Sequence, residues 1–278
     1  MSVIVHLNRL FAKPNVKGRE SSEAYADWEY SEGTALVREC LEPHGDLQGK
    51  RVLDVGCGLG GKTVAYGEGG VSQVFGADLS IDNVATSQRH TAKTPRPFVW
   101  AFFAADAARL PVPDGLFDTV ITNDAMEHFV DPEAALREMV RVTKGGGVIW
   151  LFFTPHFSPL GSHLYDYIYT PWCHLLFSRR QLRGAIREVL ASRHSQWNKA
   201  RREQELEQIM NSYDGDLNRM SVGRFFDMVR RQPGVRVSFR RLKPAKYPFL
   251  KVLTMIPLVR EFFTGSVVCR LERTGRPS

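Results

Sequence analysis

A short glycine-rich segment carries the strongest chemical signal in the sequence. Gly56, Gly58 and Gly61 fit the spacing GxGxxG and follow directly after the apolar run Arg51–Val55. Glycine lets a backbone turn sharply and approach a ligand closely, because no Cβ stands in the way. The pattern alone also describes proteins that bind dinucleotides. We therefore expect a ligand-binding turn that joins a buried strand to a helix over Thr63–Gly67.

The kind of ligand depends on Asp54, which stands two residues before the first glycine. A dinucleotide would bring a pyrophosphate to this turn, and a carboxylate beside it would repel that group. S-adenosylmethionine (SAM) instead brings an ammonium and a sulfonium, which a carboxylate attracts. Asp54 therefore favours SAM over a nicotinamide dinucleotide. The plainer alternative is that Asp54 only caps the next turn.

Two further acids follow the next two apolar runs. Asp78 comes after Gln73–Ala77, where a carboxylate can accept hydrogen bonds from both hydroxyls of a ribose. It could equally be the N-cap of the helix that follows. Asp106 comes after Phe98–Ala104, and its carboxylate is placed to accept from the amino group of an adenine, while Ala107 offers a backbone N–H to the ring. An adenosyl group suits both positions.

The elements that must position these acids alternate between apolar runs and helical segments. The runs are continuous, which is typical of strands that are covered on both faces. Pro132 and Gly145-Gly146-Gly147 mark the start and the stop of one of the helices, Glu133–Thr143. The alternation predicts an α/β fold with a parallel, doubly wound sheet and right-handed crossovers. The expected strands are Arg51–Val55, Gln73–Ala77, Phe98–Ala104, Thr119–Thr122, Val148–Phe153, Val235–Leu242 and Ser266–Leu271.

The organisation of the chain is predicted to be one domain over residues 1–278. It comprises an N-terminal helical segment (20–45), a ligand-binding core (46–154), a helical insertion (155–232) and two closing strands (233–278). In the insertion, Ser178 and Gln181 form a capping box before an amphipathic helix, and Val222–Arg231 is a further helix. We interpret the insertion, between the fifth and sixth strands, as a lid over the carboxyl edge of the sheet, where ligands bind in open α/β folds.

Four segments in order resemble the class I SAM-dependent methyltransferases. They are Asp-Val-Gly-Cys-Gly-Leu-Gly (54–60), Gly-Ala-Asp-Leu-Ser (76–80), Ala-Asp-Ala-Ala-Arg-Leu-Pro (105–111) and Phe-Asp-Thr-Val-Ile-Thr-Asn-Asp-Ala-Met-Glu-His-Phe (117–129). The chain looks similar to the ubiquinone- and menaquinone-biosynthesis type (methyltransferase type 11), over roughly residues 45–155. The resemblance implies a Rossmann-like seven-stranded sheet, mostly parallel, with an antiparallel last strand.

The resemblance also implies which residues hold each part of SAM. The methionine end would lie on the glycine loop, the ribose and the adenine beside the acids after the second and third strands, and the sulfonium beside the loop after the fourth strand. An N-terminal aromatic side chain, with Tyr25, Trp28 and Tyr30 as candidates, would cover the cofactor. The residues are Asp54, Gly56, Cys57 and Gly58 for the methionine end, Asp78 and Leu79 for the ribose, Asp106 and Ala107 for the adenine, and Asn123, Asp124 and His128 for the sulfonium.

Methyl transfer from a sulfonium is an in-line displacement. The protein must align donor and acceptor, exclude water and remove a proton where the acceptor is a hydroxyl or an activated carbon. Histidine, with an ordinary pKa of ~6.5, suits that role. We consider three catalytic histidines: His128, and His156 and His163 in the aromatic-rich stretch 155–174. Cofactor contact or simple packing is the alternative for each.

Composition narrows the function classes. The 278 residues include 37 Lys and Arg against 30 Asp and Glu, a formal charge of +7, and the four cysteines are scattered. Scattered cysteines in a chain of this length favour neither a disulfide framework nor a structural zinc site. The spacing of His163, Asp166 and His174 matches no firm metal signature, so we expect no metal. The first thirteen residues lack the pattern of a signal peptide, which predicts a cytoplasmic protein.

The acceptor is expected to be a small molecule. The basic clusters are interleaved with acids, and the segment 123–126 lacks the proline-aromatic step that holds a flipped base, so nucleic acid is disfavoured. The apolar segment 246–263 carries Lys251 and Arg260 and could make a peripheral membrane contact. We predict methyl transfer to oxygen or carbon of an aromatic or lipid-like metabolite. The alternatives are an RNA methyltransferase, an NAD(P)-linked oxidoreductase and a non-catalytic SAM-binding protein; the oligomeric state is left open.

Overall fold

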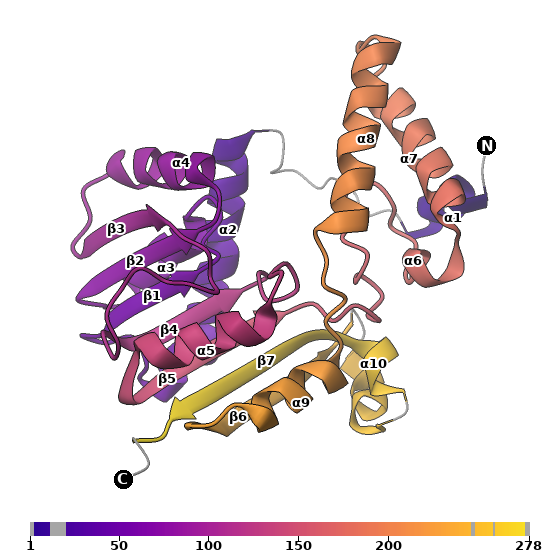
Figure 1. The fold of residues 1–278 in the computed structure, drawn as a ribbon. Helices are drawn as coiled ribbons and strands as arrows, with labels where there is room; N and C mark the ends of the chain where they lie inside the picture. The colour runs from indigo at the N-terminus through magenta and orange to yellow at the C-terminus, as the bar shows by residue number, and fades with distance from the viewer. Residues whose placement is uncertain (1–2, 12–20, 246–247, 258, 276–278) are drawn as a thin grey trace. The chain divides into compact units, whose positions relative to one another are not determined.

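The computed structural model describes residues 3–11, 21–245, 248–257 and 259–275, and the chain divides into two compact units (Figure 1). The sheet unit comprises Lys17–Phe153, Phe226–Arg241 and Val268–Ser278. The helical unit comprises Met1–Val16, Thr154–Phe225 and Leu242–Val267. Most of the predicted N-terminal segment and ligand-binding core therefore falls in the sheet unit, and most of the predicted insertion falls in the helical unit.

Seven strands form one sheet in the order β3-β2-β1-β4-β5-β7-β6, mostly parallel with an antiparallel last strand. Central β1 pairs in parallel with β2 on one side and with β4 on the other. The strand order therefore reverses between β1 and β4, and ligands of open α/β sheets bind beyond the carboxyl ends of the strands at such a point. The strands are β1 Arg51–Val55, β2 Gln73–Asp78, β3 Val99–Ala104, β4 Phe117–Asn123, β5 Thr143–Phe153, β6 Val235–Pro244 and β7 Thr264–Arg273.

Helices cover both faces of the sheet, with α5 on one side and α2 and α3 on the other (Figure 1). The helices of the described residues begin and end close to their sequence signals. They are α1 Val3–Phe11, α2 Ser22–Leu36, α3 Gly61–Glu68, α4 Ile81–Ala92, α5 Pro132–Val142, α6 Cys173–Leu176, α7 Arg179–Arg193, α8 Lys199–Gly215, α9 Val222–Arg231 and α10 Arg260–Phe263, with the short helices η1 Val37–Leu41, η2 Glu42–His44 and η3 Pro248–Met255.

The helix ends before Gly145, Gly146 and Gly147 as predicted, but the predicted start of the next strand was wrong. The strand was expected to begin at Val148, whereas β5 starts at Thr143 directly after α5 and includes the three glycines. The register between β4 and β5 is irregular at this end of the pair. A Cβ on Gly147 would lie 2.8 Å from the backbone oxygen of Asp118, so the glycine is required for the close approach of the two strands.

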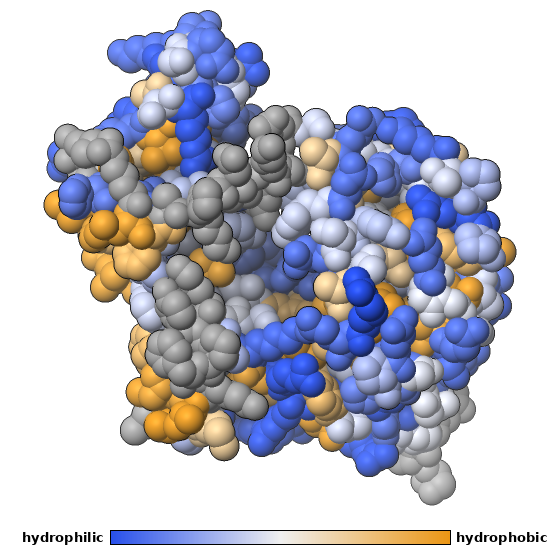
Figure 2. Space-filling model, turned by 180° about the vertical axis from the view of Figure 1, so that it is seen from behind, coloured by the Kyte–Doolittle hydropathy of each residue, from blue (hydrophilic) through white to orange (hydrophobic). Residues whose placement is uncertain are grey.

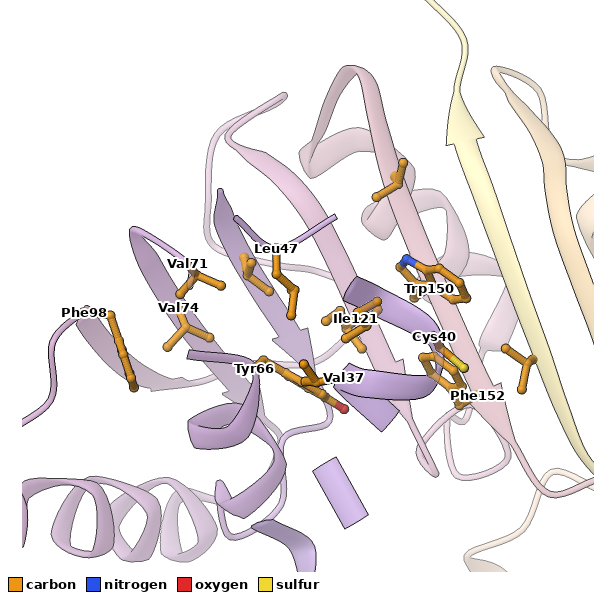
Figure 3. Close-up of a cluster of buried hydrophobic side chains, with 14 residues drawn as sticks. Val37, Cys40, Leu47, Tyr66, Val71, Val74, Phe98, Ile121, Trp150 and Phe152 are labelled. Atoms are coloured by element: carbon orange, nitrogen blue, oxygen red, sulfur yellow. The ribbon is translucent and has the colours of Figure 1, made fainter. Parts of the chain in front are cut away.

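The core of the sheet unit consists of side chains from the continuous apolar runs and from the helical segment before β1 (Figure 3). Tyr66, Ile121 and Trp150 are fully buried there. Trp150 donates its indole N–H to the buried carboxylate of Asp46 at 2.7 Å, and Arg270 of β7 donates to the same carboxylate at 2.8 Å. This polar network fixes the segment before β1 against the far half of the sheet.

The helical unit has its own core, which includes Leu182, Ile186 and Leu190 of α7 and Leu206 and Met210 of α8. The capping box predicted at the start of α7 is confirmed, because the side chains and backbones of its two residues bond reciprocally. On the surface of the hairpin formed by α7 and α8, three ion pairs connect the helices: Arg179–Asp214, Arg183–Glu207 and Arg187–Glu203.

Polar side chains prevail on the face seen in Figure 2, and apolar side chains are exposed in several places. In the helical unit the exposed apolar residues include Leu176, Val252 and Met255, with 64, 65 and 76% of their surface accessible. Among the described residues, no helix has the length and apolar character needed to cross a bilayer. Residues 246, 247 and 258 of the segment predicted to contact a membrane lie outside the described ranges.

Candidate ligand site at the glycine loop

The glycine loop follows β1 and turns back onto the neighbouring strand. The N–H groups of Gly56 and Cys57 both donate to the carbonyl of Ala77 on β2, at 2.8 and 3.0 Å. Gly56 has a φ of +78°, and a Cβ there would lie 2.4 Å from the Cβ of Ala125. Gly58 also has a positive φ, of +55°. The loop therefore depends on glycine both for its backbone conformation and for close packing.

Asp54 lies at the end of β1 beneath this loop. Its side chain is buried, and its Oδ2 accepts the hydroxyl hydrogen of Thr63 in the first turn of α3 at 2.6 Å. Burial raises the pKa of Asp54 to about 6, although the Thr63 hydrogen bond and the charge of Lys62 act in the opposite direction. The Thr63 hydrogen bond and the charge of Lys62 therefore do not fully offset the cost of burying the ionised carboxylate of Asp54.

A second buried acid, Glu29, was not predicted from the sequence. Its Oε2 accepts from the N–H of Gly61 at 3.3 Å, and its Oε1 lies 3.1 Å from the position of a Cβ on Gly58. Burial raises the pKa of Glu29 to about 7. The charge of Lys62 and the hydrogen bond from Gly61 act to lower this pKa, whereas the charges of Asp54 and Asp124 act to raise it. Glu29 thus brings a carboxylate from α2 to the glycine loop.

The packing of α2 explains how Glu29 reaches the loop. The buried residues of this helix are Ala26, Glu29 and Gly33, which are spaced three and four apart and so share one face. A Cβ on Gly61 would lie 2.1 Å from the backbone oxygen of Ala26, and a Cβ on Gly33 would lie 2.9 Å from the Cα of Lys62. Small residues on both helices therefore let α2 lie directly against the start of α3.

Lys62 is the buried cation at this site. Its Nζ lies 2.7 Å from Oδ2 of Asp124, which follows β4 with a φ of +54°. Burial opposes the charge of Lys62, but Asp124 and Glu29 outweigh it and raise the pKa of the lysine. Since Lys62 and Asp124 neutralise each other, the part of the chain that the structure describes offers no further cation to balance Asp54 and Glu29.

The eight residues Gly56–Thr63 also fit the phosphate-binding pattern GxxxxGK[ST]. In such a loop, the lysine and the hydroxyl serve the phosphates and their metal ion. Here Lys62 is paired with Asp124, and the hydroxyl of Thr63 is bonded to Asp54. Two buried carboxylates beside the loop would also repel a phosphate, so the geometry disfavours a nucleotide phosphate.

Asp78, at the end of β2, holds the loop from the other side. Oδ2 accepts from the N–H of Gly58 at 2.9 Å, and Oδ1 accepts from the N–H of Ser80 and from the Asn83 amide. The N-cap of α4 is Ser80, so Asp78 does not fill that alternative role. A carboxylate oxygen accepts two hydrogen bonds, so Oδ2 retains capacity for a ligand hydroxyl. The neighbouring Leu79 is 75% exposed and can cover a bound group.

Asp106 and Ala107 lie directly after β3, at the same edge of the sheet. Asp106 is exposed, and its Oδ1 accepts from the N–H of Ala108 at 2.9 Å, which closes a tight turn. Ala107 is buried. The pair therefore presents a rigid polar turn at the edge where an adenine is expected.

The remaining predicted cofactor residues lie on β4 and α2. Asn123 ends β4 and donates to the hydroxyl of the buried Tyr66 at 3.4 Å, and His128 lies exposed on the loop that follows. Tyr25 and Trp28 are half-buried on α2, with ring centroids 5.3 Å apart. Tyr30 instead donates its hydroxyl to Glu68 at 2.5 Å, at the far end of α3.

The other two predicted catalytic histidines belong to the helical unit. His156 contacts His174, whose Nε2 lies 2.6 Å from the backbone oxygen of His156. Burial lowers the pKa of His156 to about 4, with His174 and Arg219 acting in the same direction. That value makes it a weaker base than an ordinary histidine. His163 is half-buried and has a φ of +55°, with its ring centroid 6.1 Å from that of Tyr165.

Comparisons with known proteins agree with this geometry. Residues 53–151 match a family model described as a methyltransferase domain. A demethylmenaquinone methyltransferase of Renibacterium salmoninarum is 35% identical over 133 residues, which cover 47% of this chain and 53% of the relative. A ubiquinone biosynthesis O-methyltransferase of Chromobacterium violaceum is 34% identical over 121 residues, which cover 43 and 50% of the two chains. This chain thus spans about half the length of these curated relatives.

Among solved structures, an S-adenosylmethionine-dependent methyltransferase from Mesorhizobium loti has the same fold. It aligns over 91% of this chain and 100% of its own, with a TM-score of 0.52 and 15% sequence identity. At that identity the likeness concerns the fold alone.

Proposed function

We infer, from the premise that residues 53–151 form a class I SAM-dependent methyltransferase domain, that the whole chain is an SAM-dependent methyltransferase. Bound SAM would supply a methyl group on a sulfonium that leaves as a neutral thioether. Asp54, Gly56, Cys57 and Gly58 would hold the methionine end. The ribose and the adenine would be held by Asp78 with Leu79 and by Asp106 with Ala107, and Asn123, Asp124, Tyr25 and Trp28 would complete the cofactor site.

The observation that carries this proposal is the uncompensated negative charge at the glycine loop. Asp54 and Glu29 are both buried, and the nearby cation Lys62 is already paired with Asp124. A ligand with an ammonium and a sulfonium would supply the missing positive charge. A pyrophosphate would add negative charge at the same place, which argues against an NAD(P)-linked oxidoreductase.

We place the acceptor among small aromatic or lipid-like metabolites, methylated on oxygen or carbon. Support comes from the two curated relatives, whose names refer to menaquinone and ubiquinone, and from the aromatic-rich stretch 155–174. His163 and His128 are our choices for the base, since the lowered pKa of His156 makes it less suited to accept a proton. Once the base has taken the proton, the acceptor atom can attack the methyl group.

We propose that the protein is cytoplasmic and contacts membranes peripherally. The four cysteines are buried and form no disulfide, which is typical of proteins from a reducing compartment. The exposed apolar side chains Leu176, Val252 and Met255 of the helical unit would suit an enzyme that draws a lipid-like acceptor from a bilayer.

Calorimetry with S-adenosylhomocysteine (SAH) and with NAD tests the cofactor. The wild-type chain should bind SAH and release no heat with NAD, and Asp54→Asn should weaken SAH binding about tenfold or more, since a charge-assisted contact contributes about 1.5–3 kcal/mol. Transfer of tritium from methyl-labelled SAM to reduced quinones and to other phenols then tests catalysis. Binding of NAD with no binding of SAH would refute the proposal, and binding without transfer to any acceptor would favour a non-catalytic SAM-binding protein.

A further inference from the structure

Glu29 is a buried carboxylate with one oxygen already engaged. Oε2 accepts from the N–H of Gly61, while Oε1 makes no hydrogen bond to any described residue and lies over Gly58. Only 6% of the residue is exposed. Oε1 is not among the fully buried side-chain oxygens that lack a partner, so this oxygen can be reached by a ligand although the rest of the side chain is enclosed. The side chain therefore has one free acceptor directed at the loop where the ligand is expected.

The charges around Glu29 support a cationic partner. On its own helix, α2, the exposed Glu32 lies three residues further on, and from the elements packed against it the facing charged groups are Lys62 of α3, Asp54 of β1 and Asp124 after β4. Lys62 forms its contact with Asp124 rather than with Glu29. Glu29 and Asp54 together therefore exceed the positive charge that the described residues bring to the loop.

A purely structural role is the competing explanation. Glu29 could serve only as a cap from a neighbouring helix for the first N–H groups of α3. A neutral acceptor such as glutamine, serine or asparagine would satisfy an N–H equally well and would avoid the cost of burying a charge. The cap alone therefore does not explain why the residue is a glutamate.

We propose that Glu29 binds the α-ammonium group of the methionine part of SAM, with Oε1 as the acceptor and Oε2 held in place by Gly61. This assignment rests on the proposed function and extends the cofactor site to a helix that lies more than twenty residues before the glycine loop. Glu29 is then a binding residue that fixes the amino-acid end of the cofactor, while Asp54 provides negative charge beneath the loop.

The test compares two ligands that differ in the amino-acid end. SAH carries the α-ammonium group, whereas 5′-methylthioadenosine has the same adenosine and sulfur but lacks the amino-acid moiety. Glu29→Gln keeps the acceptor for the N–H of Gly61 and removes the charge. Glu32→Gln, on the exposed face of the same helix, is the matched control. Isothermal titration at pH 8 measures both ligands on the wild-type chain and both variants.

Glu29→Gln should weaken SAH binding by about 10- to 100-fold, as expected for loss of a hydrogen bond to a charged group. Binding of methylthioadenosine should change by less than about twofold, and Glu32→Gln should leave both affinities unchanged. The ratio of the two affinities also guards against misfolding, because a damaged site would lose both ligands together.

Equal weakening of both ligands by Glu29→Gln would show that Glu29 only supports the loop, and unchanged SAH affinity would show that it binds nothing. Either result overturns the assignment while leaving the proposed function intact. A wild-type chain that binds neither ligand would instead refute the proposed function, and the role of Glu29 with it.

Discussion

The cost of burying Glu29 without a cationic partner gives a prediction about the ligand-free protein. Burial raises the pKa of Glu29 from 4.5 to about 7, so folding favours its protonated form. For an acid whose pKa is higher in the folded state, stability is greatest at low pH and falls as the pH rises through the unfolded and then the folded pKa. Glu29 therefore destabilises the ligand-free protein increasingly between about pH 4.5 and pH 7.

The size of this effect follows from the two pKa values. One unit corresponds to ~1.4 kcal/mol, so with the pKa going from 4.5 to about 7 the ionisation of Glu29 should cost about 2 to 3 kcal/mol more at pH 8 than at pH 5. Asp54, Lys62 and Asp124 face this side chain, and the charge of Lys62 already lowers the cost. Glu29→Gln removes the titration and keeps the acceptor for Gly61.

Urea unfolding without ligand at pH 5 and at pH 8 measures this difference. At each pH the free energy of unfolding of the wild-type chain is subtracted from that of Glu29→Gln. This difference should be about 2 to 3 kcal/mol larger at pH 8 than at pH 5, because only the wild type is destabilised by ionisation of Glu29. His156 and Asp54 also titrate in this range, but their contributions largely cancel because each variant is compared with the wild type at the same pH. Glu32→Gln should show no such pH dependence. A difference that stays constant with pH would refute a buried, uncompensated Glu29.

Three further predictions concern the loop, the base and the membrane. Gly56→Ala should lower the free energy of unfolding by about 2–4 kcal/mol in urea titrations, because a positive φ and a close approach both resist a Cβ. Gly146→Ala has a similar φ but open space around its Cβ and should cost only about 1 kcal/mol; equal losses would contradict the packing argument. His163→Ala should reduce turnover about 100-fold or more with SAH affinity retained in calorimetry, and unchanged turnover would reject His163 as the base. Met255→Glu should reduce flotation with phosphatidylglycerol vesicles, whereas Val130→Glu, at a 97% exposed position of the sheet unit, should not; equal flotation of both variants would exclude the proposed membrane contact.

Local signals were sufficient where the chemistry and the fold are set by neighbours in the chain. The apolar run before the glycine loop is strand β1 with the predicted bounds Arg51–Val55, and Asp54 lies at its buried end as the spacing indicated. The alternation of strands and helices also predicted a mostly parallel, doubly wound sheet, because short crossovers leave few alternatives. The start of β5 was predicted too late in the chain, since glycines that are typical of a helix stop also permit a close approach of two strands.

Glu29 could not be found from the motifs, because a contact between α2 and the loop depends on packing over about thirty residues of chain. A weaker signal was nevertheless present. Ala26, Glu29 and Gly33 share one face of a predicted helix, and an acid flanked by two small residues on such a face indicates a charge held against another backbone. The aromatic residues Tyr25 and Trp28, which the family resemblance indicated as cofactor contacts, lie on the same helix beside Glu29.

The stability of the chain and its affinity for a cofactor are linked at this face. Each buried carboxylate with a raised pKa makes the ligand-free fold less stable at neutral pH, and a cation that binds there recovers that energy as binding energy. A methyltransferase whose loop carried only neutral acceptors would fold more stably but would distinguish a dicationic donor less well from its neutral analogues. Close packing of Gly33 and Gly61 is then as much part of the site as the acids, because without it α2 would stand too far from the loop for Glu29 to act.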